Sequence, residues 1–174
     1  MNNEQTQHPP FNEFLEQLKQ RMKQVFHVRA NIDQMAIKRG MPPFVMREIM
    51  NLKPLATGIP AEYGGRGCKM DESIALLAAA SYESLALSLT FGINSALFLQ
   101  PVAKYAGEEA KQKVFRDFLE KQNMGGLMIT EPDFGSDALN MQTRFVKKDE
   151  NFHLKGTKHW AGLTGWAEYW LLTR

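Results

Sequence analysis

The chain has 174 residues, 44% of them hydrophobic, which is enough for one conventional core or for a small domain plus part of another. Its 21 basic and 19 acidic side chains give a net charge of +2 without a block of like charge, so nucleic acid is not an expected partner. The single cysteine, Cys68, excludes an internal disulfide framework, argues against a zinc site and favours a reducing, cytoplasmic location. Residues 1–10 have neither a basic start nor an apolar run, so they are interpreted as a disordered lead-in.

Helical periodicity follows this lead-in. Apolar residues recur at three- and four-residue steps from Phe11 to Phe26, which predicts an amphipathic helix. Further helices are predicted for Ile32 to Arg39, for Pro43 to Leu52 and for Gly107 to Gln122. In the last of these, the residues expected to face inward are Ala110, Val114, Phe118 and Leu119.

A glycine-rich segment, "GIPAEYGGRG" (Gly58 to Gly67), separates the early helices from the later ones. Its glycine density excludes a helix or a central strand and predicts a structured loop. Asp71 is expected to cap the next helix. The face expected to carry that helix's packing contacts comprises Ile74, Leu77, Ala78, Ser81 and Leu85.

The uncharged segment from Ser84 to Ala103 has about the length of a membrane span. Polar residues are scattered through it, and Gly92 and Pro101 would interrupt a helix exposed to lipid. We therefore predict a pair of buried helices and no membrane span.

After Gly125 the pattern changes to short apolar or alternating runs, which are typical of strands. Asp149 to Asn151 lie at hairpin distance between two such runs, so Thr143 to Lys148 is predicted to pair antiparallel with Phe152 to Lys158. The predicted fold class is α+β: an all-α N-terminal domain at 11–123, followed at 124–174 by a partial antiparallel β-barrel or sheet.

The segment "MITEPDFGSDA" reads as an apolar strand that ends in a ligand loop. Thr130, Gly135 and Ser136 offer hydroxyls and close backbone approach to a polar or anionic cofactor, although a plain turn explains them as well. Trp160 and Trp166 are suited either to plugging a core or to covering a planar ring.

Other kinds of chemistry find no support in the sequence. His153 and His159 would share one face of a strand but stand too far apart to hold a metal together. There is no nucleophile elbow or P-loop, and Glu62, Glu72 and Glu131 have no evident acid–base partner. No catalytic or metal-binding residue is assigned.

Four segments, in chain order, resemble the acyl-CoA dehydrogenase family. "GIPAEYGGRG" is similar to its early glycine-rich loop, "YAGEEAKQKVFRDFL" to the helix before its middle domain, "MITEPDFGSDA" to its flavin loop, and "LKGTKHWAGL" to the next flavin-contacting strand. The resemblance spans about Ile32 to the C-terminus. It implies an FAD enzyme that removes the α-proton of an acyl-CoA thioester with a carboxylate and passes the β-hydrogen as hydride to FAD.

The resemblance also assigns the contacts of the flavin. Gly135 and Ser136 would approach the pyrophosphate and the pantetheine arm of the substrate, and the Thr130 hydroxyl would lie near the reactive ring nitrogen. Gly162 stands where the family usually has threonine, with Thr164 two residues later. The residues that would line or cover the ring are Leu127, Met128, Ile129, Thr130, Trp160, Ala161 and Gly162.

Substrate contacts and partners follow from the same resemblance. Thr90, Ile93 and Leu97 would line the acyl pocket, although they suit a core equally well. Family members continue into a C-terminal helical bundle with the catalytic glutamate, so the sequence is expected to be the inactive N-terminal part of a homo-oligomeric enzyme that passes electrons to an acceptor. The alternatives are a flavin monooxygenase or acyl-CoA oxidase of the same fold, or a non-catalytic interaction module.

Overall fold

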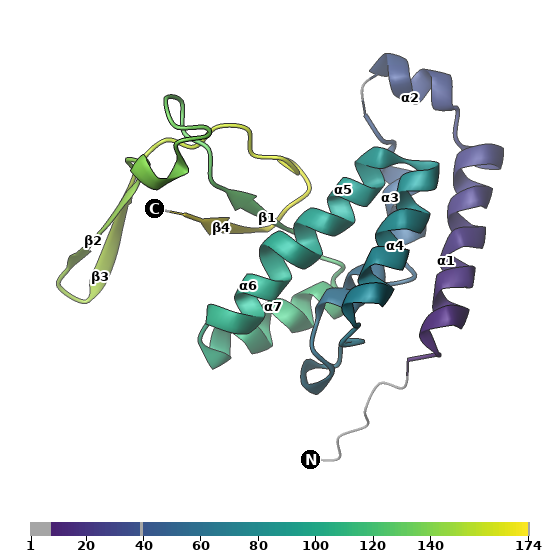
Figure 1. The fold of residues 1–174 in the computed structure, drawn as a ribbon, viewed down its shortest axis with the longest axis horizontal. Helices are drawn as coiled ribbons and strands as arrows, with labels where there is room; N and C mark the ends of the chain where they lie inside the picture. Colours follow the sequence, from purple (N-terminus) through teal and green to yellow (C-terminus); the bar gives the residue numbers. More distant parts are fainter. Residues whose placement is uncertain (1–7, 39, 174) are drawn as a thin grey trace. The chain divides into compact units, whose positions relative to one another are not determined.

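The computed structural model describes residues 8–38 and 40–173 of the chain. Two compact units are found, Met1–Gln122 and Asn123–Arg174. In the described residues the first unit is helical and the second holds the strands (Figure 1). This arrangement confirms the α+β fold class.

The first unit contains seven α-helices among its described residues, joined by shorter 3-10 and π-helical turns. The α-helices are α1 (Phe11–Gln24), α2 (Ile32–Lys38), α3 (Pro43–Met50), α4 (Met70–Glu83), α5 (Leu85–Gly92), α6 (Gln100–Tyr105) and α7 (Glu108–Glu120). The shorter turns are η1 (Val25–Arg29), η2 (Pro54–Gly58), η3 (Ala61–Tyr63) and η4 (Ile93–Leu99). The helices expected from periodicity are therefore present, with ends that differ by a few residues, and Arg39 lies outside the described residues.

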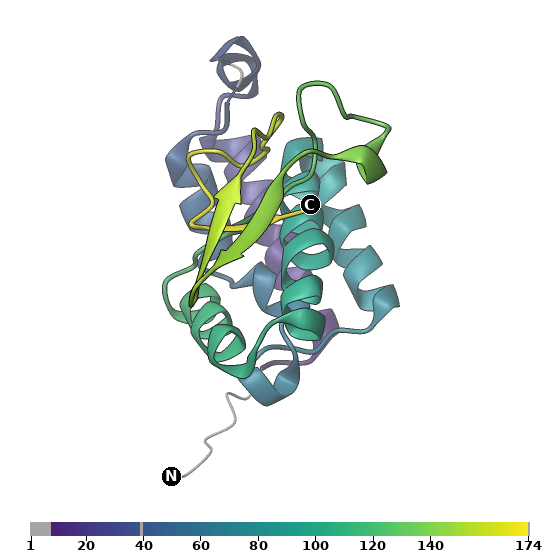
Figure 2. The same cartoon turned by 90° about the vertical axis from the view of Figure 1, so that its left-hand side faces the viewer.

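The core of this unit lies where α4 packs against α1 and α5, and where η2 packs against η4 and α7 (Figures 1 and 2). Helix α1 turns its apolar stripe inward as predicted, and burial of such side chains stabilises the unit by about 25 cal/mol per Å² of apolar surface. The largest fully buried side chains are Phe91, Phe98, Phe115, Leu18, Met22, Ile49, Leu55, Ile59, Leu76, Leu87, Leu99 and Val25.

Two details of α4 differ from the prediction. The helix begins at Met70, so Asp71 lies inside its first turn, and the Glu72 carboxylate accepts the Lys69 N–H at 2.9 Å instead. Its buried residues are Leu76 and Ala80, on a different face from the one expected. Ile74 on the predicted face is exposed, whereas Leu77 on that face is half-buried.

The prediction of two separate helices between Ser84 and Ala103 is wrong. Helices α5, η4 and α6 follow one another without a break from Leu85 to Tyr105, because the π-helical stretch η4 keeps the chain helical between α5 and α6. Asn94, fully buried, donates its side-chain amide to the Thr90 carbonyl at 2.8 Å within that stretch.

By length and composition, Leu85–Tyr105 is the one described helix that would reach across a membrane, with 39% of its apolar window buried in the structure. A core helix of a soluble protein meets the same criterion. The absence of a membrane span therefore stays a prediction.

The glycine-rich loop is structured, as predicted, and it packs closely. A Cβ on Gly65 would stand 2.1 Å from the Ile59 carbonyl oxygen, so this position admits only glycine. Residues 8–10 are held against the loop and are not part of a disordered lead-in: His8 bonds to the Gly64 carbonyl at 3.0 Å, and Arg66 donates to the Pro9 carbonyl at 3.0 Å. Residues 1–7 of that expected lead-in lie outside the described residues.

Helix α7 buries most of the face expected for it, including Val114 and Phe118, with Leu119 half-buried. Ala110, however, is exposed. Phe115 is fully buried in its place and lies against the Tyr63 ring at 4.9 Å between ring centroids.

The second unit contains two separate strand pairs. Strand β2 (Arg144–Lys148) pairs antiparallel with β3 (Asn151–Lys155), which confirms the predicted hairpin, although β3 ends three residues earlier than expected. Strand β1 (Gly125–Met128) pairs with β4 (Tyr169–Leu172), and this pairing is parallel. In Figure 1 the hairpin extends away from the β1–β4 pair.

The early end of β3 changes the interpretation of two histidines. His153 lies in β3, whereas His159 lies four residues beyond its end, so the two do not share a strand face. The chain leaves the hairpin at Gly156, where a Cβ would stand 2.8 Å from the Thr143 Cα. His159 is thereby available to the segment that follows β1.

Candidate functional site

The structure brings together the two segments assigned to the flavin. The His159 N–H donates to the Thr130 carbonyl at 2.8 Å, which places the residue before Trp160 directly beside the end of "MIT". The adjoining carbonyl, that of Ile129, accepts from Lys158 Nζ at 2.8 Å. Two consecutive backbone carbonyls after β1 are therefore held by two consecutive residues of the second segment.

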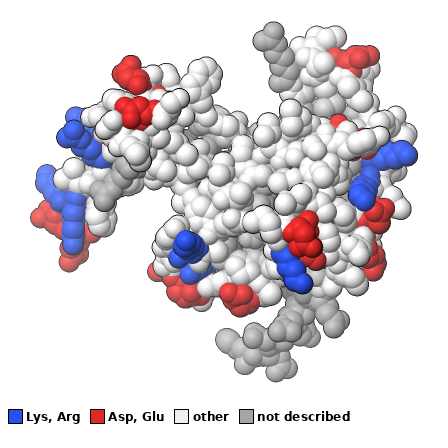
Figure 3. Space-filling model, in the orientation of Figure 1, with Lys and Arg blue, Asp and Glu red and all other residues white. Residues whose placement is uncertain are grey.

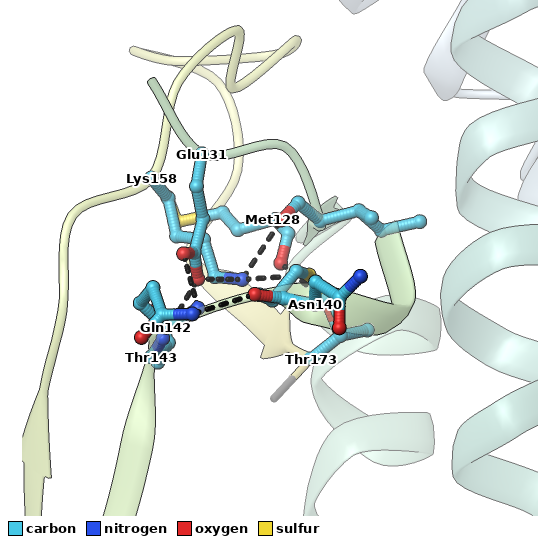
Figure 4. Close-up of polar contacts among 9 residues, drawn as sticks. Met128, Glu131, Asn140, Gln142, Thr143, Lys158 and Thr173 are labelled. Carbon is cyan, nitrogen blue, oxygen red and sulfur yellow. Dashed lines mark hydrogen bonds and ion pairs between the residues drawn. The ribbon is translucent and has the colours of Figure 1, made fainter. Parts of the chain in front are cut away.

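A buried ion pair lies at this junction (Figure 4). Glu131 and Lys158 are 4% and 6% exposed at their side chains, and Nζ stands 3.0 Å from Oε1. The Glu131 carboxylate also accepts the backbone N–H groups of Gln142 at 2.6 Å and Thr143 at 2.9 Å. One carboxylate thus joins the loop after β1 to the start of β2 and to Lys158.

These contacts favour the ionised carboxylate. Burial of Glu131 opposes ionisation, yet hydrogen bonds from Thr143, Gln142 and Lys158 lower its pKa from 4.5 to about 2. The carboxylate is therefore a permanent anion at neutral pH and is unsuited to accepting a substrate proton. Its role in the structure is to hold backbone and cation in place.

Sequence reasoning missed this pair. Glu131 was considered only as an acid–base residue, and Lys158 was not singled out. The available signal was a glutamate directly after an apolar strand, where a buried carboxylate requires a cation or several N–H donors.

Trp160 is presented to solvent on a strained backbone. Its side chain is 87% exposed, so it plugs no core within the described residues. Its φ of 56° lies in the left-handed region, which is unfavourable for a bulky residue by roughly 1–3 kcal/mol. Strain of this kind persists where the surrounding structure fixes the backbone, and it is common at ligand sites.

The residues after Trp160 form a compact turn. The Gly162 N–H donates to the Trp160 carbonyl at 2.9 Å, and the Thr164 hydroxyl donates to the Ala161 carbonyl at 2.6 Å. Thr164 lies two residues after the usual position of the family's threonine. Its hydroxyl is thus hydrogen-bonded within its own loop. Trp166 is also partly exposed, at 39%.

The loop that starts at β1 suits one wall of a flavin site. Leu127, Met128, Ile129 and Thr130 are half-buried, so each keeps accessible surface. Gly135 and Ser136 are exposed, and nothing lies within 4 Å of the place where a Cβ on Gly135 would stand. A planar aromatic cover at Trp160, an open glycine and hydroxyl donors are the kinds of groups that FAD requires.

The residues expected to line an acyl pocket lie in the first unit, on the helical run of α5 and η4. Leu97 is 44% exposed, whereas Thr90 and Ile93 are half-buried, so none of the three belongs to the core. The Thr90 hydroxyl donates to the Ala86 carbonyl at 2.9 Å. Over α5, the face drawn in Figure 3 is largely uncharged, which matches an apolar ligand or partner better than a polar one.

Hollows in the first unit occur elsewhere. One of about 390 Å³ is lined by Thr57, Gly58, Ile59, Pro60, Gly67, Cys68, Ser73, Ser95, Gln100, Ala103 and Lys104. The three predicted acyl-site residues do not line it. Burial raises the pKa of the Cys68 thiol to about 11, so this thiol is a poor nucleophile at neutral pH.

No group of three or more His, Cys, Asp and Glu side chains suited to a metal ion occurs within residues 8–38 and 40–173. His27, at an exposed helix end, pairs with Glu83 instead. Positive and negative side chains are interspersed on the face drawn in Figure 3.

Two family descriptions match the chain. The acyl-CoA dehydrogenase N-terminal domain matches residues 12–122, and the acyl-CoA dehydrogenase middle domain matches residues 126–174. Together they cover both units. The chain belongs to the acyl-CoA dehydrogenase family.

Individual proteins show the same relationship. Mitochondrial isovaleryl-CoA dehydrogenase from Bos taurus is 29% identical over 114 residues, which are 66% of this chain and 27% of that protein. A glutaryl-CoA dehydrogenase from Mycobacterium smegmatis, solved in complex with FADH2, shares the fold with a TM-score of 0.77 and 20% identity over 96% of this chain and 42% of its own. A prolyl acyl carrier protein oxidase shares it with a TM-score of 0.80 and 18% identity, over 94% and 43%.

The chain thus spans 27% of the bovine relative's length and less than half of each solved chain. The likeness to the solved structures concerns the fold alone, because their identities lie at 20% or below.

Proposed function

We propose that this chain supplies the helical domain, residues 11–123, and the first part of the middle β-domain, residues 124–174, of an FAD-dependent acyl-CoA dehydrogenase. The observation that carries the proposal is the junction of Thr130 with His159, next to an exposed Trp160 on strained backbone. The two segments that the family resemblance assigns to the flavin would thereby form one continuous wall. A family member solved with FADH2 supports the choice of cofactor.

When bound, FAD would accept the β-hydrogen of the acyl-CoA as hydride while a carboxylate base takes the α-proton, giving the 2,3-enoyl-CoA, the reduced flavin anion FADH⁻ and the protonated carboxyl group. The Thr130 hydroxyl would donate a hydrogen bond toward the electron-rich ring. Trp160 would cover the ring and exclude water from one side. Leu127, Met128, Ile129, Ala161 and Gly162 would line it.

The substrate's contacts are proposed on the same basis. Gly135 and Ser136 would approach the pyrophosphate of FAD through close backbone approach and a hydroxyl, and Ser136 would also contact the pantetheine arm of the substrate. Thr90, Ile93 and Leu97 would contact the acyl chain, and their incomplete burial leaves surface for it. No residue of the described chain is proposed as the α-proton base.

Partners and compartment complete the proposal. The enzyme would be a homo-oligomer that passes electrons to a protein acceptor. A reducing compartment such as the cytoplasm suits a chain whose one thiol, Cys68, has no second cysteine among the 174 residues.

The test uses the full-length product of the gene that contains this sequence. We expect it to purify with FAD, and we expect anaerobic titration with acyl-CoAs from butyryl to palmitoyl to bleach the flavin absorbance near 450 nm with at least one of them. A protein without flavin, or a flavin that no acyl-CoA reduces, would contradict the proposal.

An oxidase of the same fold is the second candidate, because a prolyl acyl carrier protein oxidase shares the architecture. Admission of oxygen to the substrate-reduced enzyme separates the two. Slow reoxidation supports the dehydrogenase, whereas rapid reoxidation with hydrogen peroxide formation supports the oxidase.

A further inference from the structure

The feature that the proposed function leaves unexplained is the buried ion pair of Glu131 and Lys158. Both side chains are almost fully removed from solvent, and removing two charges from water is unfavourable unless their geometry and other hydrogen bonds compensate. Here the compensation is complete for the carboxylate, which has the cation at 3.0 Å and two backbone N–H donors. Such a pair is poor as a source of stability and well suited to fixing positions.

The contacts show which positions are fixed. Lys158 Nζ reaches from its own segment to the Ile129 carbonyl at 2.8 Å, while Glu131 of the other segment reaches back to Lys158. The next residue along, His159, adds a backbone hydrogen bond to Thr130. Residues 129–131 and 158–159 are thereby held together by three contacts of different kinds, of which Figure 4 shows the ion pair of Glu131 and Lys158.

A second effect concerns the loop after β1. Because Glu131 also accepts the N–H groups of Gln142 and Thr143, it ties both ends of the loop at 132–141 to one carboxylate. Lys158 Nζ lies 3.3 Å from the Met141 sulfur at the end of the same loop. The base of the loop that carries Gly135 and Ser136 is therefore closed by the ion pair, while its tip remains exposed.

We propose that Glu131 and Lys158 are positioning residues, which lock the loop at 129–136 to the segment at 158–162 and so present Thr130 and Trp160 as one rigid wall to the flavin. This inference rests on the proposed function. Neither side chain is proposed to touch the flavin. Their effect is transmitted through the Ile129 and Thr130 carbonyls and the backbone of His159.

The variants are made in the full-length protein. Lys158→Met removes the charge while keeping an unbranched side chain, and Lys158→Arg keeps the charge. Lys121→Met is the control, because Lys121, directly after helix α7 in the first unit, also pairs with a buried carboxylate, that of Asp117 at 2.9 Å. The readouts are the Kd for FAD, the visible circular dichroism of bound flavin, and amide hydrogen exchange of residues 156–162 in the flavin-free protein.

For Lys158→Met we expect the Kd for FAD to rise by about tenfold to a hundredfold, the effect expected when a site shifts by about 1 Å. We expect a changed flavin dichroism and exchange at His159 at least about tenfold faster, since its hydrogen bond to Thr130 loosens. Lys158→Arg should recover part of each effect, and Lys121→Met should change none of them.

A wild-type Kd and wild-type exchange in Lys158→Met would overturn the positioning role. If that variant fails to fold, Glu131→Gln/Lys158→Met leaves neither charge unpaired, and flavin binding like the wild type in the double variant would overturn the role equally. The hydrogen-exchange readout needs no flavin. A wild-type protein that binds no FAD would therefore contradict the proposed function alone, while faster exchange in Lys158→Met would still support the locking of the two segments.

Discussion

The His159 N–H lies 2.8 Å from the Thr130 carbonyl oxygen, so two residues 29 positions apart in the sequence are neighbours along the backbone of the β unit. Strand β1 itself pairs with β4, Gly125 with Tyr169 and Met128 with Leu172. Strand β1 and the residues after it are thus held first by β4 and then by the segment at 158–159. The backbone bond between Thr130 and His159 therefore fixes the positions of the Thr130 side chain and of the neighbouring Trp160.

Trp160→Ala is predicted to weaken FAD retention in the full-length protein without unfolding it. The side chain is 87% exposed, so its removal leaves no cavity, while the loss of a stacked aromatic ring reduces binding by roughly 0.5–1.5 kcal/mol or more. Dialysis followed by the ratio of flavin to protein absorbance measures the effect. Phe152→Ala, an equally aromatic and 69% exposed position on the hairpin, is the control and should retain FAD. Equal retention in both variants would exclude a cofactor role for Trp160.

Thr130→Ala is predicted to slow reduction of the flavin by acyl-CoA by about tenfold or more, because a hydrogen-bond donor that stabilises developing charge is removed. Stopped-flow absorbance under anaerobic conditions gives the rate. Thr130→Ser keeps the hydroxyl and should retain most of the rate, and Thr157→Ala, at an exposed position, should retain all of it. An unchanged rate in Thr130→Ala would show that the hydroxyl does not act on the flavin.

Gly156→Ala is predicted to destabilise the β unit by about 1–3 kcal/mol. A Cβ there would lie 2.2 Å from the Thr143 hydroxyl oxygen and 2.8 Å from the Thr143 Cα, and the backbone atom has no room to move while Thr143 donates to Glu131. Gly135→Ala is the matched control, since open space surrounds that position. Chemical denaturation should show a lower midpoint for Gly156→Ala only.

The Glu131 carboxyl is predicted to make the β unit sensitive to acid. Its folded-state pKa of about 2 lies below the ordinary value of 4.5, so the unfolded chain binds the proton more readily. The stability contributed by the ionised group is fully present above about pH 4.5 and is lost as the pH falls toward 2.

Unfolding free energies between pH 7 and pH 3 test this for the wild type, Glu131→Gln and a control, Glu150→Gln in the exposed hairpin turn. Glu131→Gln should be less stable at pH 7, because Lys158 loses its partner, and should lose less stability on acidification. If the unfolding free energy of Glu131→Gln depended on pH as steeply as that of the wild type, the acid sensitivity would not arise from Glu131.

Local patterns predicted the elements well and the long-range contacts poorly. The hairpin β2–β3 followed from alternation around a short turn, and α1 from its apolar stripe, because both depend on residues close in sequence. The parallel pairing of β1 with β4 joins residues 44 positions apart, and no local signal specifies it. The alternation that suggested a strand up to Lys158 was overridden because Lys158 turns inward to Glu131.

The site shows the same division. The two segments assigned to the flavin lie together in the structure, but the ion pair that joins them was not predicted, since a buried lysine and glutamate look like two surface charges in a sequence. The continuous helix through Gly92 was missed for a related reason. Asn94 binds the Thr90 carbonyl inside a π-helical stretch, and this compensation is visible only in three dimensions.

A polypeptide of these 174 residues alone is predicted to purify colourless and to show no acyl-CoA-dependent dye reduction. In the β unit Leu139, Trp160 and Phe152 are exposed by 69% or more. Of these three, only Trp160 belongs to the proposed flavin wall, and a flavin resting on that single open wall would keep one face in water. Burial of apolar surface is worth about 25 cal/mol per Å², and the face left in water contributes none of it. The entropic cost of ordering the loop and the ligand is then not compensated. The same exposed apolar groups and the unpaired edges of two-stranded sheets should make the polypeptide self-associate, which light scattering against concentration will detect. Absorbance near 450 nm with stoichiometric FAD, in a monodisperse preparation, would show instead that the wall formed by Thr130 and Trp160 is sufficient to hold the cofactor.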